Sequence, residues 1–228
     1  MKGVLIALLI IFIWLAHLYF LLFYREVNFL NTGTYLHILI QAFLYTGLFI
    51  TAHDAMHRTV APNKFLNDLI GRVSTFLFAG MSYNRLIKNH HLHHKHPATN
   101  QDPDFYEKSQ NFFVWWTVFF YRYATIPQFL AMGVSYNLLK IFGNVPEINL
   151  WFYWIIPALL GTFQLFFFGT YLPHRKPHTD EMGIHRARTL PKNHLLAFLT
   201  CYFFGYHQEH HEGPHISWWQ LWKTKELD

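Results

Sequence analysis

Three short segments of the sequence carry histidines at helical spacing. They read His53-Asp-Ala-Met-His57, His90-His-Leu-His93-His94 and His207-Gln-Glu-His210-His211. A separation of three or four residues places side chains one turn apart on the same face of a helix. Neutral imidazole is the commonest metal ligand in proteins. Each segment is therefore predicted to present two or three metal-binding rings on one side of a helix.

The number of rings indicates more than one metal ion. A zinc site closes at four ligands, whereas the three segments supply His53, His57, His90, His93, His94, His207, His210 and His211. His174, at the end of an apolar block, is expected to be a ninth ligand. Imidazole-rich sites suit iron among other metals, and two six-coordinate ions could use nine rings and keep positions open. Thiolate ligation is not expected, because Cys201 is the only cysteine.

The second segment holds more histidines than one helix face can present. We assign the ligands to His90, His93 and His94, which repeat the spacing of the third segment, and expect His91 and His96 to face solvent or to contact the ligands from outside. The competing interpretation of all three segments is a basic or pH-sensing patch. The histidines not expected to bind metal are His17 and His37 in apolar blocks, the isolated His185, His194 and His215, and His178, which Pro177 separates from His174.

The composition is that of a membrane protein. Hydrophobic residues make up 52% of the 228 residues and charged residues 14%, where a soluble protein has about 25% charged residues. The apolar residues form four blocks, each close to the ~20 residues that a helix needs to cross a bilayer. They are Val4–Tyr24, Tyr35–Ala52, Phe112–Leu139 and Ile148–Leu172. Two weaker blocks, Leu66–Tyr83 and Leu195–Tyr206, are expected to form interfacial or re-entrant helices.

The sequence thus predicts an all-α integral membrane protein with four transmembrane helices plus short interfacial helices, in one domain over residues 1–228. Buried core helices are the alternative for any single block. A cleaved signal peptide is not expected, since the first block is too long and no small-residue cleavage site follows it.

The distribution of charge gives the expected orientation. With four crossings, residues 53–111 and 173–228 lie on one side and carry most of the lysines and arginines, while the opposite side carries Arg25 and Lys140. The positive-inside rule places the basic side in the cytoplasm, and every histidine segment falls on this side. The net charge of +5 is explained by this topology and by anionic lipid, and no nucleic-acid-binding motif is present.

Few carboxylates lie near the histidines. A metal-bound histidine usually donates its second ring N–H to a carboxylate or a carbonyl, and Asp54 and Glu209 lie within the histidine segments. The run Asp102-Pro103-Asp104 has two equal interpretations, a solvated turn or a partner of the histidines.

The pattern H-x3-H, H-x2-H-H, H-x2-H-H resembles the membrane fatty acid desaturase and hydroxylase superfamily. From about residue 50 onward, the contexts Phe168-Gly-Thr-Tyr-Leu-Pro-His174-Arg and His207-Gln-Glu-His-His-Glu-Gly-Pro-His215 resemble the bacterial-type β-carotene ketolases. This resemblance implies a non-haem di-iron centre held by the nine histidines, with O2 as co-substrate. Some desaturases carry an asparagine one turn before the extra histidine; this chain has Thr170 there, so a direct or water-bridged asparagine ligand is not expected.

The resemblance also implies the reaction and its partners. The C4 methylene of a β-ionone ring of β-carotene would become a ketone through two hydroxylations. No G-x-G-x-x-G motif is present, so electrons are expected from an external, ferredoxin-like donor, which a basic surface suits if the donor is acidic. The carotenoid would enter from the lipid of a bacterial-type inner, plasma or thylakoid-like membrane, against the aromatic residues of 112–123 and 151–168.

Two other functions remain open from the sequence. The same di-iron centre could hydroxylate a carotenoid ring, or desaturate or hydroxylate a fatty acyl chain. A histidine-rich metal transporter is the third class, but its ligands should lie near the bilayer midplane in broken helices, whereas these segments stand at the ends of the apolar blocks.

Overall fold

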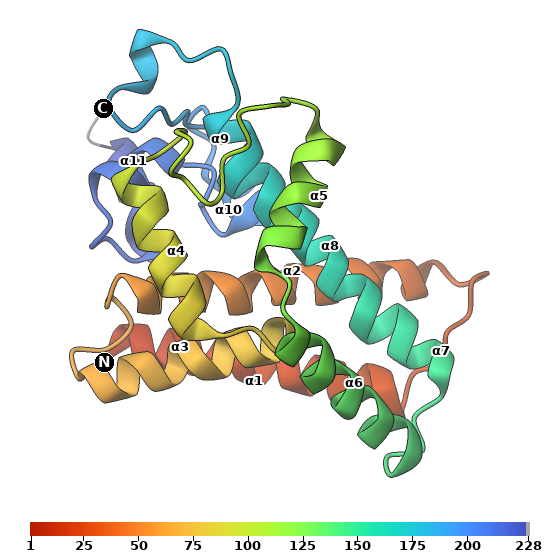
Figure 1. Cartoon of the computed structure of the whole chain (residues 1–228). Coiled ribbons are helices and arrows are strands. Elements are labelled where there is room, and N and C mark those ends of the chain that lie inside the picture. The colour runs from red at the N-terminus through yellow and green to blue at the C-terminus, as the bar shows by residue number, and fades with distance from the viewer. Residues whose placement is uncertain (227–228) are drawn as a thin grey trace.

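Long apolar helices form the frame of the molecule, as the apolar blocks predict. The computed structural model describes residues 1–226, and these contain helices and no strand; the last two residues of the domain expected over 1–228 lie outside this range. Three helices are long and apolar enough to cross a membrane: α1 (Lys2–Phe23), α2 (Thr32–Met56) and a continuous helix over Glu147–His174. Figure 1 shows α1 and α2 side by side, with α8 crossing them obliquely.

The continuous helix over Glu147–His174 contains two wider, π-helical turns. Its parts are α7 (Glu147–Asn149), η1 (Leu150–Ile155), α8 (Ile156–Phe166), η2 (Phe167–Tyr171) and α9 (Leu172–His174). Single π-helical turns inside α-helices often occur at functional sites. The second of these turns ends at Tyr171, three residues before His174, which is the last helical residue.

The expectation of one unbroken helix over Phe112–Leu139 is wrong. The chain forms α5 (Phe112–Tyr123) and α6 (Ile126–Ile141), and the extended residues Ala124 and Thr125 separate them. The cause is local: Pro127 cannot donate a backbone hydrogen bond and favours the first turn of a new helix, and the Thr125 hydroxyl accepts from the Gln128 N–H at 3.3 Å. Neither piece alone has the length of a membrane span.

The two pieces nevertheless connect the two ends of the bundle. The residue before the N-cap of α5, Gln110, accepts a hydrogen bond from Tyr171 at the histidine end. Beyond α6, Asn149 lies at the opposite end, where its side-chain amide donates to the carbonyls of Leu21, Leu22 and Arg25 at the end of α1. Helices α5 and α6 together therefore extend from one end of the bundle to the other, as a single helix was expected to do.

The weaker apolar blocks form shorter helices. Leu66–Tyr83 corresponds to α3 (Lys64–Ala79), which packs along α2; α4 (Tyr83–Lys95) then returns toward the histidine end. Leu195–Tyr206 corresponds to α10 (His194–Cys201), which ends where Tyr202 and Phe203 adopt left-handed backbone conformations and lead to α11 (His207–Glu212). Short 3₁₀ helices cover Asp180–Met182 and Trp218–Glu226.

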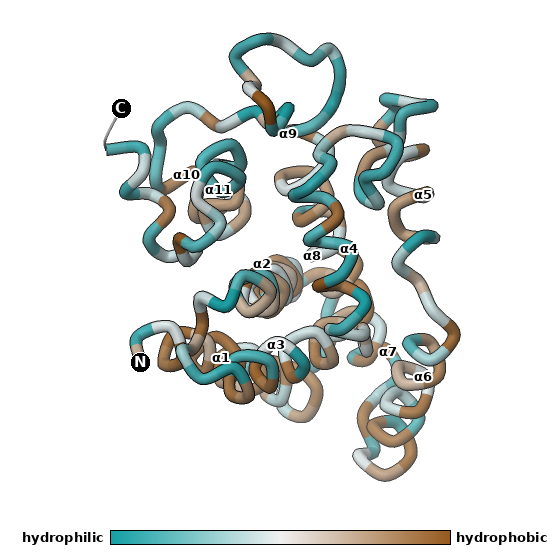
Figure 2. Tube along the Cα trace, turned by 60° about the vertical axis from the view of Figure 1, so that its left-hand side comes forward, coloured by the Kyte–Doolittle hydropathy of each residue, from teal (hydrophilic) through white to brown (hydrophobic). Residues whose placement is uncertain are grey.

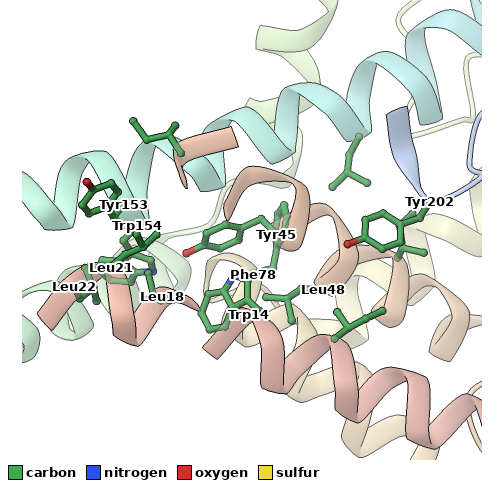
Figure 3. Close-up of a cluster of buried hydrophobic side chains, with 14 of the residues drawn as sticks. Trp14, Leu18, Leu21, Leu22, Tyr45, Leu48, Phe78, Tyr153, Trp154 and Tyr202 are labelled. Carbon is green, nitrogen blue, oxygen red and sulfur yellow. The ribbon is translucent and has the colours of Figure 1, made fainter. Parts of the chain in front are cut away.

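Hydropathy divides the molecule into two regions. Figure 2 shows hydrophobic residues concentrated along α1 and α6, and hydrophilic residues along α4 and in the segments around α9 and α11. Within the apolar region a buried cluster joins α1, α2 and the long helix (Figure 3). At its centre the rings of Trp14 and Tyr45 meet edge to face, with centroids 5.1 Å apart. This packing fixes where α2 and the long helix end relative to each other, and both helices end at predicted metal ligands.

The packing of α2 against α8 can be tested by a substitution at their close contact, Gly161. A Cβ added at Gly161 would lie 3.1 Å from Tyr45 Cβ and 3.2 Å from the Ala42 carbonyl oxygen. We expect Gly161→Leu to destabilise the protein by about 1–3 kcal/mol through overpacking, measured as a lower midpoint of thermal unfolding in detergent. Gly133→Leu is the control, because no atom of the described residues outside its own helical turn lies within 4 Å of a Cβ added there. Equal midpoints for the two variants would contradict the contact.

Candidate metal centre

All nine predicted histidines come together at one end of the bundle. His53 and His57 come from the end of α2, and His174 comes from the end of α9. The other six are supplied by α4 and α11, namely His90, His93, His94, His207, His210 and His211. Four segments that are distant in the sequence therefore contribute to one site.

The rings form two groups. The first contains His53, His57, His90, His94 and His210, and the second contains His93, His174, His207 and His211. Within each group, one nitrogen of every ring lies within 4.8 Å of the corresponding nitrogen of every other ring. The groups are adjacent, since the rings of His94 and His211 stack with centroids 4.3 Å apart.

The nitrogens within each group point toward one another. The Nε2 atoms of His57 and His90 are 2.6 Å apart, and those of His94 and His210 are 3.1 Å apart. In the second group, His207 Nε2 is 3.0 Å from that of His174 and 3.1 Å from that of His211. Such converging lone pairs can be satisfied together by a cation at their centre.

Buried ring atoms without partners support this interpretation. His53 is 2% exposed, and neither of its ring nitrogens has a hydrogen-bond partner among residues 1–226. A buried polar atom without a partner costs about 1–3 kcal/mol, and a bound ion would offset this cost. Groups of five and four nitrogen donors fit two ions that suit imidazole, among them iron and zinc.

The environment of the rings keeps them in the form that binds metal. Burial and the neighbouring imidazoles lower the pKa of His207, His210 and His211 well below the usual value. Loss of solvation, together with the nearby ring of His91, lowers the pKa of His57 to about 3. These rings are neutral at pH 7, as metal ligation requires.

His93 is the exception, because it faces a carboxylate. Burial by itself would lower its pKa, but Asp102 and then Asp104 outweigh this effect and raise the pKa of His93 to about 9. His93 Nδ1 lies 2.9 Å from an oxygen of Asp102, which also accepts the Ala98 N–H at 2.8 Å. This contact fixes the ring and leaves Nε2 free for an ion, an arrangement common at metal sites.

The run Asp102-Pro103-Asp104 is therefore a buried partner of the site and not a solvated turn. Asp102 is 2% exposed. From the sequence the two interpretations are equal, because Asp and Pro also favour turns, and the chain does form a turn here. The only sequence signal for the buried role is the position of the run soon after the second histidine segment.

The carboxylates inside the histidine segments have other contacts. Asp54 is 4.0 Å from His53 Nδ1, and both of its carboxylate oxygens accept the Trp218 N–H, at 3.3 and 3.2 Å. Glu209 accepts the Thr189 hydroxyl at 2.6 Å and pairs with Lys225. Both carboxylates thus attach C-terminal segments to the site.

The remaining histidines lie outside the two groups. His91 Nε2 lies 3.3 Å from the Met56 carbonyl oxygen, and His178 Nε2 lies 3.0 Å from the His174 carbonyl oxygen. The ring centroid of His185 lies 5.4 Å from that of His211. His17 and His37 are 3.0 Å apart between α1 and α2.

An apolar cavity of about 450 Å³ ends at the two groups of rings. His53, His90, His93 and His207 line it, and Thr170 stands beside them, one turn before His174. Its other walls come from α2, α3, α5, α6, η1 and α8, and include Phe49, Phe78, Phe119, Phe120, Tyr123, Phe129, Met132, Trp151, Leu159 and Phe166. Both predicted aromatic stretches thus contribute to the walls.

The cavity opens toward the outer surface of the helices. Phe129, Trp151 and Leu159 line it, yet they are 58%, 49% and 40% exposed. These residues belong to α6 and the long helix, in the hydrophobic region of the molecule (Figure 2). The opening therefore faces the side where lipid would lie.

The fold and the site together define a helical protein with three candidate membrane spans and with histidine groups that could hold metal ions. The chain belongs to the fatty acid desaturase family, whose model matches residues 30–148 and 141–227.

The similar curated proteins carry narrower names. The chain is 42% identical over 189 residues to the zeaxanthin 4-ketolase of Chlamydomonas reinhardtii, a match that covers 81% of the chain and 42% of that protein. It is 38% identical to beta-carotene 4-ketolase 3 of Haematococcus lacustris, over 84% of the chain and 63% of that protein. It is 39% identical to the beta-carotene ketolase of Paracoccus sp. strain PC1, over 80% of the chain and 75% of that protein. The chain thus spans less than two thirds of the length of the first two, and no solved structure matches it.

The two groups of rings predict the metal content. We expect the purified protein to bind two metal ions per chain, and His207→Ala to lose at least the ion of the second group, because His207 contacts both His174 and His211. Elemental analysis of the purified variants measures this. His91→Ala is the control, since its ring contacts a backbone carbonyl outside both groups. The same metal content in the His207→Ala variant and in the parent protein would exclude the assignment.

Proposed function

We propose that the protein is a di-iron oxygenase that converts the C4 methylene of a β-ionone ring of β-carotene, or of a related carotenoid, to a ketone. The apolar cavity that ends at His53, His90, His93 and His207 carries this proposal, because it would bring an apolar substrate directly to the metal centre. The names of the similar proteins support the choice of substrate.

The nine histidines would hold two iron ions, which supply the activation of dioxygen when bound. The allylic C–H bonds at C4 are weaker than those of an ordinary methylene. Two hydroxylations of the same carbon give a geminal diol, which loses water to leave the ketone. Each hydroxylation would consume one O2, two electrons and two protons, placing one oxygen atom on the carbon and releasing the other as water, so the reaction depends on an external reductant.

The residues of the chain contribute position and exclusion of water. The aromatic walls of the cavity, among them Phe119, Phe166 and Phe204, suit a conjugated chain. Asp102 orients His93 from the side away from the ion. Because the cavity is apolar, water has few polar groups to bind there, which favours reaction with the bound ring.

A basic surface lies over the exposed edge of the centre. His57 and His94 are only half-buried, and the exposed cations Arg58 and Lys95 adjoin them in the sequence. Lys88, His91 and Lys95 stand on one face of α4, since they are spaced by three and four residues. We infer that an acidic, ferredoxin-like protein docks here and delivers the electrons.

The proposed orientation places this surface in the cytoplasm. It rests on the positive-inside rule and on four traverses of the bilayer, with α5 and α6 together making the third. The substrate would enter from the lipid at Phe129, Trp151 and Leu159.

Pigment analysis tests the reaction. In a bacterial host that makes β-carotene, we expect the protein to shift the pigment toward 4-keto carotenoids, identified by liquid chromatography and mass spectrometry. His210→Ala is the inactive control, because its ring belongs to the first group. Rings that are only hydroxylated, or altered acyl chains with unchanged carotenoids, would rule out the ketone-forming activity.

Thiol labelling tests the orientation. Cys201 is fully buried, so an introduced cysteine is the only accessible one. In intact cells we expect an impermeant maleimide to label Leu30→Cys, in the α1–α2 connection, and to label Ile184→Cys only after the membrane is opened. Both parent residues are highly exposed, at 97% and 89%. Labelling of both cysteines in intact cells would contradict the proposed topology.

A further inference from the structure

The histidine end of the cavity has a further polar wall besides the rings and Thr170. Asp104 and Tyr123 both line the cavity there, and the Tyr123 hydroxyl donates to Oδ1 of Asp104. The second carboxylate oxygen, Oδ2, lies 3.9 Å from His93 Nδ1, which is already bonded to Asp102. Among residues 1–226, no donor bonds this oxygen, and 14% of the Asp104 side-chain surface remains accessible. A carboxylate oxygen is thus available to an occupant of the cavity.

The position of this carboxylate is fixed by α5. The Trp115 indole N–H donates to the Asp104 carbonyl at 2.7 Å, and the Asp104 N–H donates to Asp102 at 2.8 Å. The Arg122 guanidinium donates to the carbonyls of Pro103 and Phe105, at 2.9 and 2.7 Å. A polar group held in this way can recognise a ligand with little loss of conformational freedom.

We infer that Asp104 and Tyr123 form a subsite for a hydroxyl group on ring carbon C3, and so determine whether a hydroxylated ring is accepted. This inference rests on the proposed function. C3 is bonded to C4, so a ring whose C4 faces the metal-binding histidines must place a C3 substituent close to them. Asp104 is the carboxylate that borders both the cavity and His93. The C3 hydroxyl would donate to Oδ2 of Asp104.

The pairing of the two residues explains how one cavity can take both kinds of ring. Burying a hydroxyl without a partner is strongly unfavourable, so a wholly apolar cavity end would reject a 3-hydroxylated ring. Conversely, a site whose polar groups depend on the substrate rejects an analogue that lacks the hydroxyl. Here Tyr123 already occupies one oxygen of Asp104, which lowers the penalty for an unsubstituted ring.

A competition experiment tests the subsite. Membranes containing the parent protein or a variant are supplied with equal amounts of β-carotene and zeaxanthin, the 3,3′-dihydroxylated carotenoid, and with reductant. The ratio of the two 4-keto products gives the ratio of the kcat/KM values, independently of the amount of active protein. We expect the parent protein to use both substrates. Asp104→Asn should lower the zeaxanthin to β-carotene ratio about tenfold, as loss of a hydrogen bond to a charged group would. Tyr123→Phe leaves the second oxygen of Asp104 without its donor, so it should raise the ratio by disfavouring the unsubstituted ring.

A matched variant and a binding measurement separate this role from a structural one. Tyr171→Phe also removes one phenolic hydroxyl, which bonds the Gln110 carbonyl at 3.1 Å outside the cavity, and should leave the ratio unchanged. The metal-free protein should retain zeaxanthin less well relative to β-carotene after Asp104→Asn, measured from the extracted pigment.

Three results would overturn the subsite. They are equal losses of both products in the Asp104→Asn and Tyr123→Phe variants, the same shift in the Tyr171→Phe variant, and a parent protein that oxidises β-carotene but not zeaxanthin. A parent protein that forms no 4-keto product from either carotenoid would instead refute the proposed function.

Discussion

The need to bring nine imidazole rings within a few ångströms governs the whole arrangement. Neutral rings with converging nitrogens gain little from one another without a cation, so their positions must be imposed by the helices that carry them. The apolar frame does this: α2 and the helix over Glu147–His174 pack closely at Gly161, and both end at histidines of the site. Helices α4 and α11 supply the other rings. Changes in the frame far from the rings should therefore alter the centre.

The residues that gather in the centre were predictable because they obey a local rule. Spacing of three and four residues assigns rings to helix faces without knowledge of the fold, and His90, His93 and His94 lie in the two groups while His91 lies outside them. The apolar blocks likewise predict α1, α2 and the helix over Glu147–His174, because about 20 apolar residues are informative on their own.

The contacts around the rings were less predictable, because they depend on where loops fold back. Asp54 and Glu209 are near the rings in sequence, yet they contact Trp218 and Thr189. Asp102 follows no helical spacing from the histidines, yet it contacts His93. The break before α6 was missed for another reason: hydropathy averages over a window, while a proline and a capping threonine act at a single position.

The lateral opening of the cavity has a consequence for how any occupant is supplied. A molecule that enters beside Phe129 and Trp151 comes from the hydrocarbon phase, so its effective concentration is its mole fraction in the membrane and not its amount per volume of water. Diluting the membrane with inert lipid would then slow the protein, while diluting the suspension with buffer would not. Saturation of such a protein is set by the composition of the bilayer around it.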